Sequence, residues 1–580
     1  MTTTIAHRLI LAAGLALAVG SCSSKSNSNG IGPNPCATGQ MLCGDTCLDV
    51  LSDSNNCGGC GIPCLGGQVC QNGTCGCASG IMCNGACTAS DSCATGVDGS
   101  TSSTGGTPDG GGTGGTAGSG PAITGTGGAP APQTTLVTSG PSGYWQTSGP
   151  LTTVTSGNAT VTVNDTSTAQ TWEGFGGAFN EKGWFYLQML SQTDRDMAIH
   201  LLYGSDGARF NMGRVPMGAS DYAVERYTDD EVPAGSTDYA MASFTTDRDA
   251  MYLIPYIKAA QAVNGSIRLW ASPWTPPTWM KNGASADGSA FDGMKMTDDP
   301  QILTANAQYF IKFVQAYAQQ GITLEAVAPQ NEPTFSENYP SCVWTGPLFA
   351  KFVGQYLGPA ITAAGLPTKI MLGTMSKSDG DPAIVSAVMG DATARSYIKI
   401  LGYQWGMKPS VGSANSSYHL PVWQTEHQCG NYPWMSGYKS TAPNDQAYAV
   451  ESWGLIRDWI KAGVTSYSAW NMVLDTVGNS IDSKMPWAQD ALLTVDTAAK
   501  KLNTTPAYWV FRHVSQFVTP GATVVGTSGG DAVAFKNRDG SLVAVMYNAG
   551  AATTYTLAVG GKKLQFAMPA TGWATVMYVP

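Results

Sequence analysis

The stretch LEAVAPQNEP, residues 324–333, decides the fold that this sequence predicts. Its apolar first half has the composition of a β-strand, and Pro333 stops the strand because proline has no amide hydrogen. Asn331 and Glu332 are thereby delivered side by side at the strand end. The stretch PVWQTE, residues 421–426, repeats the arrangement and ends on Glu426. Two strands that each end on a glutamate predict two carboxyls facing one cleft, the minimum equipment for cleaving a glycosidic bond.

Strand patterns alternate with helical patterns around these two stretches, over residues 172–504. Helical segments such as 302–319 have apolar residues three and four apart. The eight strand candidates are 172–177, 209–215, 267–272, the strand ending at Glu332, 369–373, 398–405, the strand ending at Glu426, and 466–471. Eight β/α units predict an α/β fold of the (β/α)8 TIM barrel type. Active sites of that fold lie at the carboxyl ends of the strands, where both glutamates are expected.

A second pattern, in which small polar and apolar residues alternate, flanks the predicted barrel on both sides. It is present in the segments 152–155, 159–163, 532–535, 542–547 and 574–579. Such alternation is typical of an antiparallel sheet with one exposed face. We therefore expect residues 141–171 and 505–580 to meet in one β side domain attached to the barrel.

The chemistry expected at the two strand ends follows from the neighbours of the glutamates. A retaining glycosidase needs one carboxyl to attack the anomeric carbon and a second to protonate the leaving oxygen. Asn331 offers an amide to the sugar 2-hydroxyl, a contact that strengthens in the transition state. This predicts Glu332 as the acid/base and Glu426 as the nucleophile. The alternative for a single glutamate is a solvated strand-end carboxylate.

The first 21 residues have the pattern of an export signal. His7 and Arg8 precede an apolar run, residues 9–19, that is too short to span a bilayer. The following VGSC, residues 19–22, is similar to the bacterial lipobox, which predicts that Cys22 becomes a lipidated N-terminus. The alternative is a plain secretory peptide with a chance cysteine. Both interpretations predict that the mature chain is exported. It is then either anchored to the cell envelope or surface by lipid, or secreted.

Cysteines are concentrated after this signal, with twelve of the 15 between Cys36 and Cys93. In an exported chain such a dense, even set predicts a small disulfide-rich module over residues 22–93. Zinc is the alternative, because Cys57, Cys60 and Cys64 are spaced like a metal knuckle, although the segment contains no histidine. Residues 43–61 resemble the plant stigma-specific Stig1-type repeat, which names no activity.

Residues 94–140 are composed mostly of Gly, Ser, Thr, Ala and Pro. This composition cannot bury a core and predicts a flexible linker. It would separate the catalytic part from a membrane surface.

Two further cysteines, Cys342 and Cys429, follow the two glutamates closely in sequence. If the glutamates face each other, the loops that carry these thiols are neighbours at the barrel mouth. In an oxidising compartment the two thiols can pair, provided that their Cα atoms come close enough. The alternative is two separate buried thiols.

Composition excludes some classes of partner. Charged residues make up 12% of the 580 residues and the net charge is −10, so the basic surface that nucleic acid binding requires is not expected. The 16 Trp and 23 Tyr suit sugar faces, but they suit ordinary cores as well. No metal-ligand spacing or phosphate-binding glycine loop accompanies the glutamates, so neither a metal nor another cofactor is predicted.

The barrel and side sheet together resemble glycoside hydrolase family 30, the glucosylceramidase family, from about Gly174 to the C-terminus. The motifs that carry the resemblance are GFGGAF at 174–179, RVPM at 214–217, ASPWTPPTW at 271–279 and AVAPQNEP at 326–333. The resemblance implies a retaining hydrolase of β-glucosidic bonds, with β-1,6-glucan or another β-glucoside as substrate. It is nearer to glucosylceramidases and endo-β-1,6-glucanases than to xylanases.

The resemblance also implies roles for individual residues. Arg214 would orient Glu426 and keep it ionised, and Asp221 would bind hydroxyls of the non-reducing sugar. The sequence YQWG at residues 403–406 departs from the family's sixth-strand pattern, in which His and aromatics recur. Packing at the barrel rim is the alternative role for each tryptophan. The implied substrate-binding residues are Arg214, Asp221, Trp274, Asn331, Trp405 and Trp470.

Two other functions fit part of the sequence. A family 30 xylanase that recognises glucuronic acid branches needs cationic contacts from the side sheet, and the few Lys and Arg residues after Pro520 form no evident cluster. A non-catalytic surface adhesin that binds carbohydrate is the second alternative, and the intact Glu332, Glu426 and Asn331 argue against it.

Overall fold

The computed structural model describes residues 40–43, 46–49, 52–53, 69–71, 74–76, 81–83, 86–88, 134–147 and 149–580. The chain divides into two compact units, residues 1–125 and 126–580. The predicted export signal with Cys22, half of the cysteines between Cys36 and Cys93, and most of the linker and of the Stig1-like stretch lie outside the described residues. No helix among the described residues is long and apolar enough to cross a membrane.

In the first unit the described residues form three antiparallel hairpins. Each hairpin pairs two short strands that follow each other in the chain. They are β1 (Gln40–Cys43) with β2 (Thr46–Asp49), β3 (Val69–Gln71) with β4 (Thr74–Gly76), and β5 (Ile81–Cys83) with β6 (Ala86–Thr88).

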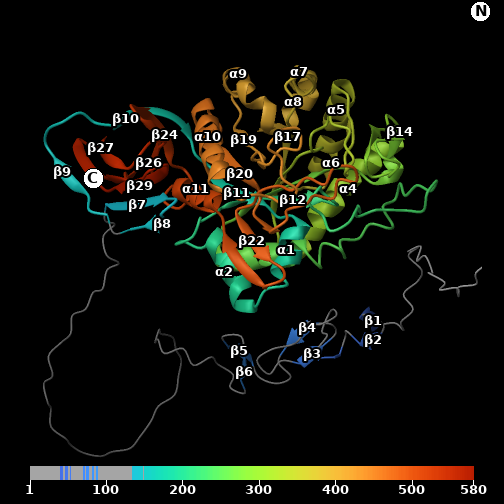
Figure 1. The fold of residues 1–580 in the computed structure, drawn as a ribbon. Helices are drawn as coiled ribbons and strands as arrows, with labels where there is room; N and C mark the ends of the chain where they lie inside the picture. The colour runs from blue at the N-terminus through green and yellow to red at the C-terminus, as the bar shows by residue number, and fades with distance from the viewer. Residues whose placement is uncertain are drawn as a thin grey trace, which may run out of the picture. The chain divides into compact units, whose positions relative to one another are not determined.

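The second unit contains a closed barrel of parallel strands (Figure 1). All eight predicted strands are present, and the last strand closes on the first with Gly176 opposite Ser468. In barrel order they are β11 (Gly174–Ala178), β12 (Met212–Met217), β13 (Arg268–Pro273), β16 (Leu324–Val327), β17 (Lys369–Met375), β18 (Ile398–Tyr403), β19 (Val422–Gln424) and β20 (Ser466–Asn471). The predicted TIM barrel is therefore confirmed.

Helices connect the strands and cover the barrel from outside (Figure 1). The longest, α4 (Pro300–Gln319), is capped by Asp299, whose side chain accepts hydrogen bonds from the amides of Gln301 and Ile302. The others are α1 (Glu181–Leu187), α2 (Gln192–Tyr203), α3 (Leu253–Val263), η1 (Thr278–Met280), α5 (Gly346–Phe352), the π-helical turn η2 (Val353–Leu357), α6 (Gly358–Ala363), α7 (Asp381–Gly390), α8 (Ala392–Tyr397), η3 (Trp405–Ser410), α9 (Val411–Tyr418), α10 (Gln446–Ala462) and α11 (Pro506–Ser515). Small hairpins and sheets decorate the loops: β14 (Lys281–Ser285) with β15 (Gly293–Met296), and β21 (Val473–Asp475), β22 (Leu493–Asp496) and β23 (Lys501–Thr504).

A ten-stranded sheet lies beside the barrel, with α11 between the two (Figure 1). The two ends of the second unit meet in it as predicted, since β7 pairs with β29 and β10 with β24. The sheet begins at Thr135, inside the stretch that the sequence assigned to the linker. Its strands, in sheet order, are β8 (Gly143–Gln146), β7 (Thr135–Gly140), β29 (Gly572–Tyr578), β26 (Leu542–Asn548), β25 (Asp531–Lys536), β24 (Thr523–Ser528), β10 (Val161–Thr171), β27 (Thr553–Val559), β28 (Lys562–Met568) and β9 (Thr152–Val154).

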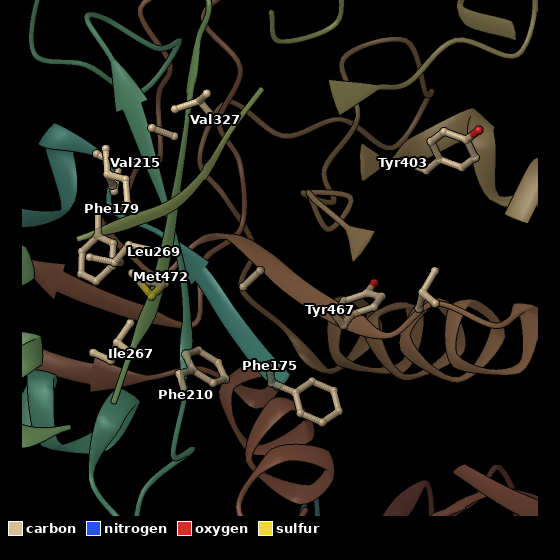
Figure 2. Close-up of a cluster of buried hydrophobic side chains, with 14 of the residues drawn as sticks. Phe175, Phe179, Phe210, Val215, Ile267, Leu269, Val327, Tyr403, Tyr467 and Met472 are labelled. Carbon is tan, nitrogen blue, oxygen red and sulfur yellow. The ribbon is translucent and has the colours of Figure 1, made fainter. Parts of the chain in front are cut away.

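Buried aromatic and aliphatic side chains fill the space between the barrel strands and their helices. Figure 2 shows Phe179, Leu269 and Met472 in one such cluster. A Cβ atom at Gly177 would lie 2.4 Å from Met472 Cγ, and one at Gly213 would lie 2.5 Å from Phe179 Cε2. The glycines of the first two strands are therefore required by close packing.

The two strands that precede Glu332 and Glu426 end earlier than predicted. β16 ends at Val327 and β19 at Gln424, so neither strand reaches its glutamate. Pro329 lacks an amide hydrogen for the ladder, and Glu332 adopts a left-handed backbone conformation with φ of 45°. The glutamates are consequently carried by turns immediately beyond the strands.

Cys342 and Cys429 do not pair, so the alternative of two separate thiols holds. Both are free, buried thiols. Cys342 packs in the main barrel core, whereas Cys429 packs in a separate cluster with Trp274 and Trp470. Since the two side chains enter different clusters, they do not meet in the geometry that a disulfide requires.

Candidate active site

A cavity of about 520 Å³ lies where the loops that follow the barrel strands converge. Arg214 is fully buried and lies behind the cavity wall. The described residues contain no group of three or more His, Cys, Asp or Glu side chains that could hold a metal ion. The cavity is lined by seven of the residues that the sequence singled out: Asp221, Trp274, Asn331, Glu332, Trp405, Glu426 and Trp470.

The Glu426 carboxylate is held at both oxygens. Arg214 Nη1 donates to Oε2 at 2.7 Å, and Trp405 Nε1 donates to Oε1 at 2.8 Å. The Glu426 residue is 7% exposed, and the guanidinium partner is not exposed at all. A buried, charge-assisted pair of this kind fixes the orientation of the carboxylate.

Arg214, on β12, holds Asn331 as well as Glu426. Its Nη2 donates to Asn331 Oδ1 at 2.6 Å, and Thr374 Oγ1 donates to the same oxygen at 2.6 Å. Ser272 Oγ accepts from Nε and Nη2 of the guanidinium at 3.3 and 3.2 Å. Because Asn331 Oδ1 already accepts two hydrogen bonds, the Asn331 Nδ2 group is the donor available to the cavity.

Glu332 has a different set of neighbours. Its backbone amide donates to the Thr374 carbonyl at 3.0 Å, and Gln404 Nε2 donates to its Oε1 at 3.0 Å. Thr425 Oγ1 donates to Gln404 Oε1 at 2.8 Å, which fixes the direction of the Gln404 amide. Burial raises the pKa of Glu332, and the nearby charge of Glu426 raises this pKa further.

Asp221, Trp274 and Trp470 line the cavity. The two indole rings are stacked with centroids 5.2 Å apart, and the Arg214 guanidinium lies 4.3 Å from the centroid of Trp274. Burial and the charge of Glu426 raise the pKa of Asp221 to about 8. A carboxyl with this pKa both donates and accepts hydrogen bonds near neutral pH, which suits sugar hydroxyls.

Several residues of the site could not be recognised in the sequence. Gln404, which contacts Glu332, lies within the stretch that departs from the expected sixth-strand pattern, and that departure was the available signal. Ser272 and Thr374 belong to β13 and β17, where nothing in the sequence distinguishes them from core residues. Trp434 and Trp487 also line the cavity, and both come from long loops without a recognisable pattern.

Comparison with protein families agrees with this geometry. Residues 172–518 match the glycosyl hydrolase family 30 TIM-barrel domain, and residues 521–576 match the family's β-sandwich domain. The chain belongs to glycosyl hydrolase family 30. The family is one of O-glycosyl hydrolases, so this family 30 chain acts on carbohydrate.

Relatives of this family 30 chain carry several names. Putative glucosylceramidase 4 of Caenorhabditis elegans is 28% identical over 432 residues, which cover 70% of this chain and 80% of the relative. Endo-1,6-beta-D-glucanase BGN16.3 of Trichoderma harzianum is 25% identical over 421 residues, which cover 67% of this chain and 80% of the glucanase. The crystal structure of SrfJ from Salmonella typhimurium superposes with a TM-score of 0.67 at 21% identity, covering 77% of this chain and 99% of SrfJ.

Proposed function

We propose that this family 30 chain is a retaining hydrolase of β-glucosidic bonds that works by double displacement. The observation that carries the proposal is the contrast between two carboxyls in one cavity. Glu426 accepts hydrogen bonds from Arg214 and Trp405, whereas Glu332 is a carboxyl whose pKa is raised by burial and by Glu426. A pair of carboxyls in opposite environments supplies a nucleophile and an acid.

In the first step a Glu426 oxygen attacks the anomeric carbon while Glu332 gives its proton to the leaving oxygen. The carbon–oxygen bond to the leaving group breaks, and an ester to Glu426 forms. In the second step water passes a proton to Glu332 and attacks the anomeric carbon, so that the ester bond breaks. Asn331 Nδ2 donates to the 2-hydroxyl, and its position is fixed by Arg214 and Thr374.

The substrate class that we propose is a β-1,6-glucan or another β-glucoside. Relatives named glucosylceramidase and endo-1,6-β-glucanase support glucose as the sugar at the reacting bond. Asp221 beside the stacked Trp274 and Trp470 suits one glucosyl unit, with a carboxyl for its hydroxyls and indole rings as walls.

Two measurements test this function. Purified protein is offered β-linked glucans, xylans and glucosylceramide, and the products are identified. NMR then follows the anomer released from the substrate that is hydrolysed. A β-anomer formed first is the expected result, and a first-formed α-anomer contradicts double displacement.

We also propose that the enzyme is exported and anchored through a lipid on Cys22, which rests on the sequence VGSC at residues 19–22. A lipid anchor on the envelope suits an enzyme that attacks a polymer outside the cell. Replacing Cys22→Ala is expected to release activity from the membrane fraction into the soluble fraction. Unchanged partitioning of the variant contradicts the anchor.

A further inference from the structure

The cavity extends well beyond the residues assigned to the reacting bond. Two of the loops that line its outer part are the one between β16 and α5 and the one between β21 and β22. The loops are joined because the amide of Ser483 donates to the carbonyl of Asn338 at 3.1 Å. The carboxyls of Glu337 and Asp482, one from each loop, line this part of the cavity.

Hydrogen bonds hold the backbone of the Glu337 loop, whereas the Glu337 carboxyl takes part in none of them. The Glu337 amide donates to Ser341 Oγ at 3.0 Å, and Arg226 Nη2 donates to the Asn338 carbonyl at 2.8 Å. Within residues 149–580 the half-buried Glu337 carboxyl makes no hydrogen bond. Burial and the charge of Asp482 raise its pKa to about 7, against the opposing effect of Lys377. The carboxyl is therefore available to a ligand in the cavity, on a backbone that is held in place.

Aromatic rings form another part of the outer wall. Trp434 is 67% exposed, and its ring centroid lies 5.1 Å from that of Trp487. Trp487 Nε1 donates to the Asn431 carbonyl at 2.8 Å, which fixes its ring, and its centroid lies 6.0 Å from that of Trp405. Since Trp405 donates to the Glu426 carboxylate, the row of rings runs from the reacting centre to the rim.

This outer part lies on the side of the acid. The loop that carries Glu337 starts at Glu332 itself, and the Phe335 amide donates to the Glu332 carbonyl at 2.9 Å. Asp221, Trp274 and Trp470 take the sugar whose bond breaks, so the outer part receives the group that leaves. Flat rings beside carboxyl oxygens fit a sugar, which offers an apolar face and several hydroxyls.

The same groups disfavour other leaving groups. An acyl chain over Glu337 and Asp482 would remove both carboxyls from water and would give the Glu337 carboxyl no hydrogen-bond partner, which is costly. An anionic uronate would be repelled by the same two carboxyls. Lys377, which also lines the cavity, lies 3.8 Å from the centroid of Phe335 and offsets part of the acidic charge. The charges of Glu337, Asp482 and Lys377 together therefore favour an uncharged sugar as the leaving group.

We propose that Trp434, Trp487, Glu337 and Asp482 form a leaving-group subsite for a neutral sugar, stacked on the indoles and hydrogen-bonded to the carboxyls. This inference rests on the function proposed above and deepens it. It favours an oligosaccharide or polysaccharide as substrate over a sugar linked to lipid.

The test uses the second chemical step, in which an acceptor replaces water. A 2-deoxy-2-fluoro-β-glucosyl fluoride forms an ester with Glu426 that water hydrolyses slowly. An added sugar reverses the leaving-group step, because its hydroxyl oxygen bonds to the anomeric carbon, its proton passes to Glu332, and the ester to Glu426 breaks. Methyl β-glucoside serves as the acceptor because it presents a hydroxyl at each candidate linkage position.

The expected result is reactivation that saturates with methyl β-glucoside and is slower with methyl β-glucuronide. Trp434→Ala and Glu337→Ala should each lower the second-order rate constant for reactivation by methyl β-glucoside about tenfold. Trp434→Phe should recover most of this loss, because a flat ring is restored. Tyr239→Ala, which removes an exposed aromatic ring outside the cavity, is the matched control and should behave like the wild type.

Three outcomes overturn the subsite. The first is reactivation that rises linearly with methyl β-glucoside up to its solubility limit. The second is equal reactivation of the wild type, Trp434→Ala and Glu337→Ala. The third is reactivation by sphingosine in detergent micelles but not by methyl β-glucoside, which points to a lipid leaving group. If the fluorosugar does not label Glu426 in an intact-mass measurement, the proposed function itself fails.

Discussion

Glu426 and Glu332 follow two parallel strands of the same barrel, but their surroundings differ in kind. Glu426 accepts hydrogen bonds from a buried guanidinium and an indole, at 2.7 and 2.8 Å. Glu332 accepts one from the neutral amide of Gln404, and burial raises its pKa. The donors come from other strands and loops, so the role of each carboxyl is set by its neighbours rather than by its own stretch of sequence.

Removing the nucleophile tests the Glu426 side most severely. Glu426→Ala is expected to lower kcat by about 10⁴-fold or more, because no ester can form. Azide should restore turnover and give an α-glucosyl azide, which NMR identifies. A β-azide from this variant would reverse the roles assigned to the two carboxyls.

Removing the acid tests the Glu332 side. Glu332→Ala should lower kcat/KM about 10²- to 10⁴-fold for a substrate with a poor leaving group, such as an oligosaccharide. Dinitrophenyl β-glucoside needs no proton on its leaving oxygen, so its first step should be nearly spared. Azide should here give a β-glucosyl azide, and equal losses on the two substrates would contradict the assignment.

Breaking the buried ion pair tests what holds Glu426. Arg214→Leu should lower the free energy of unfolding by about 3–5 kcal/mol, because the variant leaves a buried carboxylate without its partner. Chemical denaturation followed by tryptophan fluorescence measures this loss. The matched control is Lys408→Met, which breaks the 3.4 Å surface pair with Asp458 and should cost about 1 kcal/mol or less. Similar losses in both variants would mean that burial of the pair has no special effect.

The smallest expected effect concerns the amide beside the acid. Gln404 donates to Glu332 and so stabilises its charged form, which lowers the pKa of Glu332. Gln404→Leu should raise that pKa by up to about one unit. Because Glu332 must be protonated in the first step, activity falls as pH rises through this pKa, and the variant's alkaline limb of kcat/KM should move to higher pH. The control is Gln170→Leu, which is remote from the site and should leave the alkaline limb of kcat/KM where it is. An unmoved limb in Gln404→Leu would mean that Gln404 only fills space beside Glu332.

Local sequence determined the barrel and the two carboxyls. The apolar runs before Glu332 and Glu426, the helical spacing of residues 302–319 and the alternating segments of the side sheet all form the predicted elements. These patterns are local, because the periodicity of a strand or a helix can be recognised within a few consecutive residues. The same locality explains why Glu332 and Glu426 could be recognised as strand-end groups before their neighbours were known.

Only the tertiary structure decided how those groups work. Sequence patterns could not place Trp434 beside Trp487, or join the loops of Glu337 and Asp482, because these contacts connect distant loops without periodicity. They also left open whether Cys342 and Cys429 pair, because the nearness of these residues to the glutamates in the chain did not say into which cluster each thiol points. Sequence supplies the reacting groups, and packing supplies the donors, charges and rings that give each group its role.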